Sequence, residues 1–559
     1  MRDGVALSAT VYRDPKETKR VPAIVTMTPY IAAHAARQGV YFAQNGYVFV
    51  AVDSRGRGNS DGRFVPGQVE AHDGYDLVEW AAKQPWCDGQ VAMWGGSWLG
   101  FTQWTTAKEM PPHLKAIAPT AAVYPGVDYP QAHGMFFNYA LQWLQFVNGR
   151  ALNQGMFDSE ALWRNAAMQL FAQKGSFQDL EGIAGATGTV FRTWIQHPRE
   201  DAFWQAMTPT AADYAKLRIP VLTITGAYDA DQLGALTYYA RHMASGAAEV
   251  IARHWLLIGP WSHSGTRRPT PDLGGVTFGP GAVLDMEALH KAWYDHVLKG
   301  GPRPEQLPDR VNVFVMGTNT WIHAPDLAHV ENTPLRFELD VAGAVAGDIG
   351  RTGRLGAKVK NAGAVVLTSD PLAVPSSEEL EAEFPEFLRD QRDSYKVRAS
   401  RVVLQTAPFD AATVISGRPR VHVQVSSDQP DADLWAELDE VLPDGSAIQL
   451  ADTGLRLRYR GGGVAGVPLV KNKLERIELP PMTFFARSIA KGSRLRLVLD
   501  AGPFWGVQAN NHTGGDAASE PLTAARVGKL TIYTGPGRDS ALELTRPDDA
   551  LLPPAPAPR

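Results

Sequence analysis

The feature that most constrains the fold is an apolar run that leads directly into two glycines and a serine. Residues 90–94 are short, continuous and apolar, as buried strands are, and Gly95, Gly96 and Ser97 follow without a break. Two similar runs occur earlier, at residues 22–27 and 47–52. Stretches with helical character lie between the runs, at residues 35–44 and 70–80. This alternation predicts a doubly wound α/β domain with a parallel sheet.

The chain is too long for one compact core, so several folding units are expected. The α/β pattern stops near residue 124 and resumes at residue 219, and the segment between is rich in aromatic residues, which indicates a helical insertion. Beyond residue 311, alternating runs separated by turn clusters are typical of a β-sandwich or jelly roll. The predicted units are an α/β domain (1–123 and 208–305), a helical cap (124–207), an all-β domain (306–547) and a disordered tail (548–559).

Composition excludes several classes of partner. The net charge of −5 contains no long run of either sign, which makes nucleic acid and anionic membranes poor partners. The sequence has no apolar run long enough for a membrane helix and no signal-peptide pattern at its start. As written, the chain is expected to be cytoplasmic. However, Asp3-Gly4 followed by an alternating strand resembles the second half of a hairpin, so a missing leader and a periplasmic or secreted protein form the alternative.

Ser97 has the surroundings of an activated nucleophile. It lies between a predicted strand and a predicted helix, with small residues before it and Gly100 after it. Hydrolases present a nucleophilic serine on such a tight turn, although Leu99 stands where the strict Gly-x-Ser-x-Gly motif has its second glycine. The alternative is that Ser97 only caps the following helix. Ser488 and Lys491 also fit a Ser-x-x-Lys motif, but they lie in the all-β region without its companion motifs, so we attribute that match to chance.

A base and an orienting acid are expected from later strand ends. Asp229 follows the apolar run at residues 219–226, and His263 follows the run at residues 254–259. The carboxyl ends of strands in an open α/β sheet form the ligand crevice, so these residues are expected to converge on Ser97. His263 would then take the serine proton while Asp229 holds its tautomer. The backbone N–H of Trp98 and the hydroxyl of Tyr30 are candidate donors to the oxyanion.

Together these residues resemble the cocaine esterase and X-Pro dipeptidyl-peptidase (CocE/NonD) superfamily of α/β hydrolases, which includes α-amino acid ester hydrolases and glutaryl-cephalosporin acylase-like proteins. The matching stretches cover nearly the whole chain: residues 1–5, 28–30, 53–62, 95–100, 228–229, 259–263, 314–317 and 511–515. The resemblance implies an α/β-hydrolase domain, a helical cap and a galactose-binding-like jelly roll. It also implies a triad of Ser97, Asp229 and His263, with Tyr30 and Trp98 at the oxyanion hole. Trp98 departs from the tyrosine usual at that position.

The resemblance leaves the substrate open. Asp231 is the nearest counterpart of an acid that holds the substrate ammonium in the amino acid ester hydrolases, while Gln232 stands where another acid could be. Asp128 is a further candidate on a less certain match, and both acids could equally be solvated loop residues. Cap aromatics such as Phe136 could line the pocket or form the core of the cap.

The sequence therefore predicts a serine hydrolase that cleaves a small-molecule ester or amide through an acyl-enzyme. Carboxylesterase, X-Pro dipeptidyl peptidase and α-amino acid ester hydrolase or β-lactam acylase remain open as its subclass. A catalytically silent carbohydrate-binding protein is the alternative from another class. Neither a metal nor a cofactor is predicted, because the chain lacks clustered ligands and a complete glycine-rich dinucleotide motif. A homo-oligomer is compatible with this layout.

Overall fold

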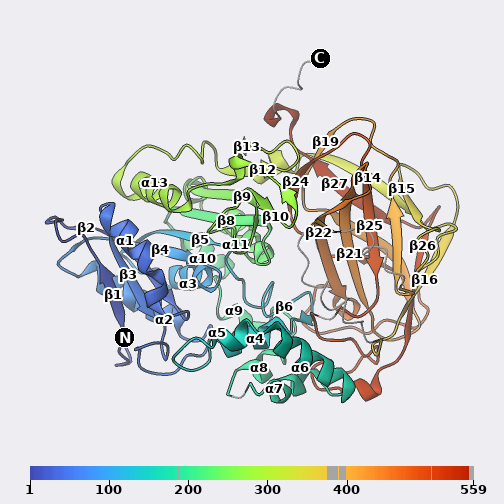
Figure 1. The fold of residues 1–559 in the computed structure, drawn as a ribbon, viewed down its shortest axis with the longest axis horizontal. Coiled ribbons are helices and arrows are strands. Elements are labelled where there is room, and N and C mark those ends of the chain that lie inside the picture. Colours follow the sequence, from blue (N-terminus) through green and yellow to red (C-terminus); the bar gives the residue numbers. More distant parts are fainter. Residues whose placement is uncertain (187, 374–387, 390–397, 505, 553–559) are drawn as a thin grey trace.

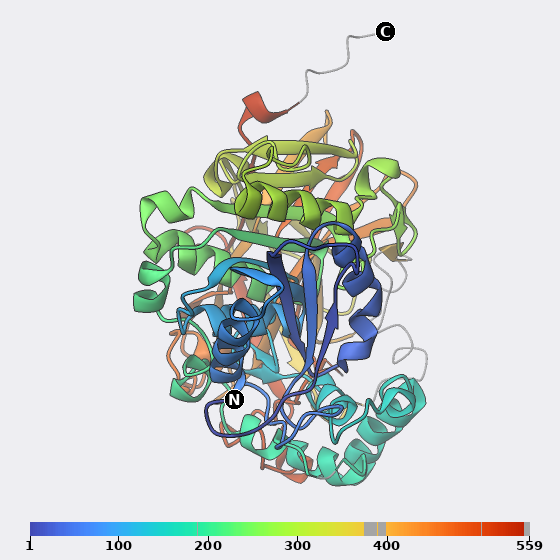
Figure 2. The ribbon, with the colours of Figure 1, turned by 90° about the vertical axis from the view of Figure 1, so that its left-hand side faces the viewer.

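The computed structural model describes residues 1–186, 188–373, 388–389, 398–504 and 506–552. Figure 1 shows an α/β part and a β-rich part side by side, with a group of helices beneath both. Figure 2 views the α/β part face on, with the same helices at the lower edge. None of the described helices has the length and apolar character needed to cross a membrane.

A nine-stranded sheet forms the α/β part. Its strands pair in parallel except at the two edges, where the first and last strands in the order are antiparallel to their neighbours. In sheet order the strands are β1 (Ala9–Tyr12), β3 (Val48–Asp53), β2 (Val21–Thr28), β4 (Cys87–Gly96), β5 (Leu114–Thr120), β8 (Val221–Tyr228), β9 (His254–Ser262), β12 (Val311–Val315) and β13 (Thr320–Ala324). The predicted apolar runs thus become neighbouring buried strands whose carboxyl ends share one edge.

Helices cover both faces of this sheet because alternate strand residues point to opposite sides. Ile24 and Phe49 pack with Phe42 and Trp293, which come from the helices on one face. These helices are α1 (Ala36–Gln44) and α13 (Met286–Lys299). The opposite face packs against α2 (Glu70–Ala82), α3 (Trp98–Ala107), α10 (Ala211–Lys216) and α11 (Gln232–Ser245). The shorter α12 (Ala248–Ile251) precedes β9.

The segment between β5 and β8 is mainly helical. It contains a short hairpin, β6 (Gln131–Ala132) and β7 (Met135–Phe136), followed by α4 (Tyr139–Phe146), α5 (Gln154–Phe157), α6 (Glu160–Ala172), α7 (Leu180–Ile183), α8 (Phe191–Trp194) and α9 (Ala202–Gln205). Its aromatic residues form a buried cluster that includes Phe136, Trp143 and Trp194. Apolar packing of this kind explains why an aromatic-rich segment folds as a separate helical layer.

The β-rich part is built mainly from antiparallel pairs around one core. Its strands, in pairing order, are β16 (Gly363–Ser369), β26 (Gly528–Thr534), β20 (Arg420–Ser427), β27 (Ala541–Arg546), β14 (Thr333–Asp340), β15 (Gly353–Gly356), β18 (Arg401–Gln405), β25 (Arg494–Asp500), β21 (Asp433–Val441), β22 (Ala447–Arg456) and β17 (Leu388–Arg389), with β23 (Glu475–Glu478) beside β20. A separate pair joins β19 (Thr413–Gly417) and β24 (Phe485–Ile489). Alternate residues of β20, Val421, Val423 and Val425, are buried in the core. The more specific jelly-roll description stays a prediction.

The boundary between the two parts differs from the predicted one. The sequence pattern assigned residues 311–315 to the all-β domain, but β12 pairs in parallel with β9 and so extends the first sheet through β13. An alternating run looks the same at the edge of either sheet, and only the pairing decides. In the predicted disordered tail, residues 549–551 form a single 3₁₀ turn, and residues 553–559 lie outside the described residues.

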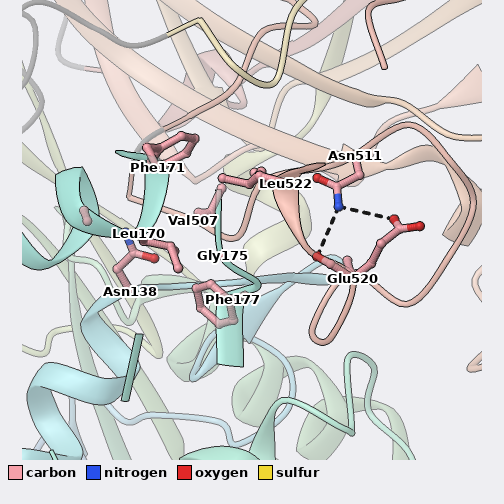
Figure 3. A pocket seen from close by; sticks show the side chains of 12 residues that line it. Asn138, Leu170, Phe171, Gly175, Phe177, Val507, Asn511, Glu520 and Leu522 are labelled. Carbon is pink, nitrogen blue, oxygen red and sulfur yellow. Dashed lines mark hydrogen bonds between the residues drawn. The ribbon is translucent and has the colours of Figure 1, made fainter. Parts of the chain in front are cut away.

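The helical segment between β5 and β8 meets the β-rich part at a cluster that Figure 3 shows from close by. A cavity of about 20 Å³, room for about one water, lies between α6 and the loop at residues 506–522. Leu522 donates its backbone N–H to Gly175 of the cap at 3.1 Å, and within the loop the Asn511 amide donates to Glu520. The Asn-His-Thr-Gly-Gly motif at residues 511–515 therefore belongs to a loop that is hydrogen-bonded to the helical segment between β5 and β8.

Candidate active site

Ser97 sits on a strained turn between β4 and α3. Its φ of 62° lies in the left-handed region that residues with a β-carbon rarely adopt. The Ser97 N–H donates to the Thr120 carbonyl at 2.9 Å, which holds the turn against β5. Gly100 lies so close to the chain after β5 that a β-carbon there would be 2.7 Å from Cβ of Ala122. The glycine that comes one position late in the motif thus permits close packing of α3.

Asp229 and His263 meet just beyond the ends of β8 and β9. Nδ1 of His263 is 2.8 Å from Oδ1 of Asp229, whose other oxygen accepts a hydrogen bond from Thr225 at 2.8 Å. The Asp229 side chain is fully buried, whereas the His263 side chain is 31% exposed. A buried acid therefore orients a partly accessible imidazole, which leaves Nε2 of His263 as the nitrogen free for proton transfer.

Tyr30 follows β2 and lies near Ser97. Its hydroxyl accepts a hydrogen bond from Nε1 of Trp143 at 2.9 Å. Burial raises the pKa of Tyr30 to about 12, against the opposing effects of the Trp143 and Ser97 side chains. The phenol therefore keeps its proton at neutral pH and can donate to a developing negative charge.

Comparisons with known proteins identify the family to which the chain belongs. Residues 3–265 match the family model for X-Pro dipeptidyl-peptidase (S15 family), and residues 305–543 match the model for the C-terminal non-catalytic domain of X-Pro dipeptidyl-peptidase. The chain belongs to the S15 (CocE/NonD) family. Cocaine esterase from Rhodococcus sp. (strain MB1 Bresler) is 28% identical over 97% of this chain and 96% of its own length. Membership in this family makes the protein a serine hydrolase.

Solved structures share the fold over nearly the whole chain. An aminopeptidase from a Thaumarchaeota archaeon has a TM-score of 0.81 and 22% identity, covering 97% of this chain and 94% of that one. An α-amino acid ester hydrolase has a TM-score of 0.78 and 21% identity, covering 98% and 95% of the two chains. The shared fold therefore includes both the α/β part and the C-terminal β-rich part of this chain.

Trp98, which departs from the usual residue of the family, has its own buried partner. Its indole N–H points to Oε1 of Glu70 at 3.3 Å, and its ring lies 4.7 Å from that of Trp143, centroid to centroid. Glu70 also accepts hydrogen bonds from the backbone N–H groups of Gly67 and Val69. Burial raises the pKa of Glu70. Nothing in the sequence singled out Glu70, because its contact with Trp98 joins residues of two separate helices.

Asp231 joins the His263 cluster. Its Oδ2 is 3.4 Å from Nδ1 of His263, so two carboxylates share one imidazole. Burial lowers the pKa of His263, but the Asp231 and Asp229 carboxylates outweigh it and the net shift is upward. Burial also raises the pKa of Asp231. Asp229, Asp231 and His263 are the one group of three ligand-type side chains found among the described residues, but the histidine nitrogen that faces the carboxylates is already hydrogen-bonded to Asp229.

The other two predicted substrate contacts have different surroundings. Asp128 is buried, and its two oxygens accept the backbone N–H groups of Tyr124 and Gly234 at 2.8 Å each. Phe136 is fully buried in the cap core. These contacts give Asp128 an anchoring role and Phe136 a packing role, and neither residue is joined to Ser97 or His263 by an interaction among the described residues.

Proposed function

We propose that this S15-family enzyme hydrolyses carboxylic ester or amide bonds through an acyl-enzyme on Ser97. In this mechanism His263 removes the hydroxyl proton of Ser97 as the serine oxygen attacks the carbonyl carbon, then gives the proton to the leaving group. Water repeats the sequence on the acyl-enzyme, which releases the acid and restores the serine. The observation that carries the proposal is the 2.8 Å contact between His263 and Asp229, on strands parallel to the one that ends at Ser97.

The oxyanion of the tetrahedral intermediate needs two donors. Tyr30 is the candidate for the first donor role, because its hydroxyl keeps its proton at neutral pH and the Ser97 side chain influences its pKa. The N–H of Trp98 supports the second, because a residue at the first position of a helix has no carbonyl to bond within that helix. Both groups are fixed before substrate arrives, which is the condition for strong electrostatic stabilisation.

Carboxylester hydrolysis is the subclass we favour. The similarity to cocaine esterase extends over 97% of the chain, and an ester has the better leaving group for a serine nucleophile. X-Pro dipeptidyl peptidase and α-amino acid ester hydrolase or β-lactam acylase activity are the alternatives, and both would use Asp231 to bind a substrate amine. The position of Asp231 against His263 supports an acid at the site, although His263 itself occupies one of its oxygens.

The division of the chain into domains is part of the same proposal. We assign residues 1–123 and 208–305 to an α/β-hydrolase domain, to which β12 and β13 add two strands. Residues 124–207 form its cap, and the antiparallel β-rich part is assigned as a jelly roll. A homo-oligomer and the cellular compartment stay predictions.

The test compares the wild-type protein with Ser97→Ala and a matched control, Ser488→Ala, in β24. The substrates are p-nitrophenyl butyrate, phenylglycine methyl ester, ampicillin and Gly-Pro-p-nitroanilide, and a fluorophosphonate probe reports the reactive serine. Turnover and labelling lost only in Ser97→Ala are expected. Turnover that survives in Ser97→Ala overturns the assignment of the nucleophile, and an unlabelled, inactive wild-type protein indicates a silent hydrolase fold instead.

A further inference from the structure

Arg267 is a cation held beside the nucleophile by a short, rigid turn. Thr266 donates its backbone N–H to Ser262 and its hydroxyl to the carbonyl of His263, and the N–H of Arg267 donates to Ser264. These bonds tie the backbone of Arg267 to that of His263. The turn therefore fixes the point from which the Arg267 side chain extends.

The guanidinium of Arg267 lies against the bare backbone of Gly96. A β-carbon at Gly96 would be 2.8 Å from Nη1 of Arg267 and 3.1 Å from the Thr120 carbonyl. Gly96 directly precedes Ser97, so the arginine occupies space beside the nucleophile turn. Gly96, the second glycine of the Gly-Gly-Ser run, therefore leaves room for the Arg267 guanidinium, which the strand-to-helix turn alone does not require.

No acid forms an ion pair with this arginine within the described residues. Asp231 contacts His263, Glu287 contacts Arg37 and Gln38, and Asp285 caps the first turn of α13. No hydrogen bond or ion pair of the Arg267 side chain occurs in the parts of the chain that the structure describes. A half-buried guanidinium with five donors favours a planar anionic partner.

A cavity of about 730 Å³ opens at this guanidinium. Its walls include Gly95 and Gly96 before the nucleophile, Ser264 after the base, and Trp94 and His290 deeper in the domain. The volume lies in the range of small-molecule sites, roughly 300–1,000 Å³. The cavity therefore reaches the two glycines that precede Ser97 and the residue that follows His263. Arg267 lies on its wall together with Arg37, Arg268, Asp285 and Glu287.

The charge of Arg267 acts on the site itself. It opposes the upward pKa shifts of Tyr30 and of Asp231, and it lowers the pKa of His263 against the two carboxylates. All three groups therefore lie within electrostatic range of the guanidinium. An anion bound to Arg267 would be close enough to belong to a molecule attacked by Ser97.

We propose that Arg267 binds a carboxylate of the substrate, so that the enzyme prefers esters or amides that carry a negative charge. This inference rests on the proposed function and adds the substrate class to it. The carboxylate can belong to the acyl group or to the leaving group, and both present the same planar anion to the guanidinium. Arg267 is then a substrate-binding residue and takes no part in proton transfer.

The test uses two matched substrate pairs. The acyl pair is the p-nitrophenyl monoester of adipic acid and p-nitrophenyl hexanoate, and the leaving-group pair is 4-acetoxybenzoate and its methyl ester. For each pair, kcat/KM is measured with the wild-type protein, Arg267→Gln, Arg267→Lys and a control at an exposed arginine that does not line this cavity, Arg253→Gln. The ratio of the anionic to the neutral member isolates the contribution of the carboxylate.

We expect the wild-type protein to favour the anionic member of one pair. Arg267→Gln should lower that ratio by roughly tenfold to a hundredfold, mainly through the KM of the anionic member. Arg267→Lys should retain part of the ratio because it keeps the charge without the fork geometry, and Arg253→Gln should leave it unchanged. An unchanged ratio in Arg267→Gln, an equal loss in Arg253→Gln, or no anionic preference in either pair overturns the inference.

A binding measurement separates this inference from the proposed reaction. Monomethyl adipate, with its carboxylate on the acyl group, and 4-acetoxybenzoate, with its carboxylate on the leaving group, are each titrated calorimetrically into Ser97→Ala and into the double variant Ser97→Ala/Arg267→Gln. Binding that requires Arg267 supports the inference even if no ester is turned over, a result that would count against the proposed function alone. Equal binding by the two proteins, or binding by neither, overturns the inference even if neutral esters are hydrolysed.

Discussion

The side chain of Gln232 forms a closed pair of hydrogen bonds with the backbone of Phe484, 252 residues away. Its Nε2 donates to the Phe484 carbonyl at 2.8 Å, and its Oε1 accepts the Phe484 N–H at 2.6 Å. Gln232 begins α11, directly after Asp231, and Phe484 directly precedes β24. Ala227 and Tyr228, at the end of β8, also pack into the core of the β domain. The C-terminal part therefore supports the loop that carries Asp229.

This pairing predicts that an acid is not tolerated at position 232. In Gln232→Glu the buried side chain can no longer donate to the carbonyls of Phe484, Gly226 and Ala227. A carboxylate buried against carbonyls should lower the free energy of unfolding by about 3 kcal/mol or more. Chemical denaturation measures this loss, and kcat/KM should fall with it because the Asp229 loop loosens.

Gln232→Met provides the comparison, because it removes the same hydrogen bonds without adding a charge. Its loss of stability should be smaller than that of Gln232→Glu. If Gln232→Glu denatures at the same concentration as the wild-type protein, the pair with Phe484 does not support the loop.

The local sequence pattern was sufficient to identify the strands after which the candidate site residues lie. Ser97, Asp229 and His263 each follow a short apolar run, and in the structure each lies directly beyond β4, β8 or β9. Burial on both sides of a parallel sheet imposes that pattern, so it can be recognised without tertiary information. Their triad role and the oxyanion donors stay a proposal that rests on chemistry and on the family.

The other site features depend on contacts between segments that are distant in the sequence, which no local pattern predicts. Glu70 contacts Trp98 between two helices, and Arg267, in the turn after β9, contacts Gly96 at the end of β4. Gln232 looked like a lost acid in the sequence, but its partner lies in the other half of the chain. The same limit applies to β12, whose alternation suits either sheet until its pairing with β9 is known.

Adding a methyl group at Gly100 should destabilise the protein. In Gly100→Ala the new carbon would lie 2.7 Å from Cβ and 2.8 Å from Cα of Ala122, so the backbone beside the nucleophile turn must shift. Overpacking of this kind costs about 1–3 kcal/mol, and we expect a larger relative loss of kcat because Ser97 is displaced. Gly155→Ala in α5 is the control, since no atom lies within 4 Å of the added carbon. Equal kcat values in the two variants would contradict this packing argument.

Tyr30→Phe should impair the chemical step rather than binding. The substitution removes a hydroxyl that keeps its proton at neutral pH and whose pKa the Ser97 side chain influences. Loss of one oxyanion donor typically lowers kcat about 100-fold to 1,000-fold, so steady-state kinetics should show that fall with a KM within severalfold of the original. Trp143→Phe keeps the Tyr30 hydroxyl and loses only its 2.9 Å donor, and should have the milder effect. A Tyr30→Phe variant with an unchanged kcat would remove Tyr30 from the oxyanion hole.

The decrease of kcat/KM at acid pH, the acid limb of the pH profile, should depend on the carboxylates around His263. Burial lowers the pKa of His263, but Asp231 and Asp229 raise it further, so its pKa lies above the usual value. The base must be neutral to accept the serine proton, and activity should therefore fall as pH decreases through this raised pKa. Asp231→Asn removes one negative charge, which destabilises the imidazolium and lowers the pKa.

The limb of log kcat/KM against pH should consequently move to lower pH in Asp231→Asn, and the variant should keep a larger share of its maximum at acid pH. Because Asp231 and His263 interact, the wild-type limb belongs to the pair, and the variant leaves His263 to titrate with Asp229 alone. The exposed control Asp272→Asn should leave the limb in place. A limb that stays fixed in Asp231→Asn would mean that Asp231 carries no charge where the base titrates, and that Asp229 alone raises the pKa of His263.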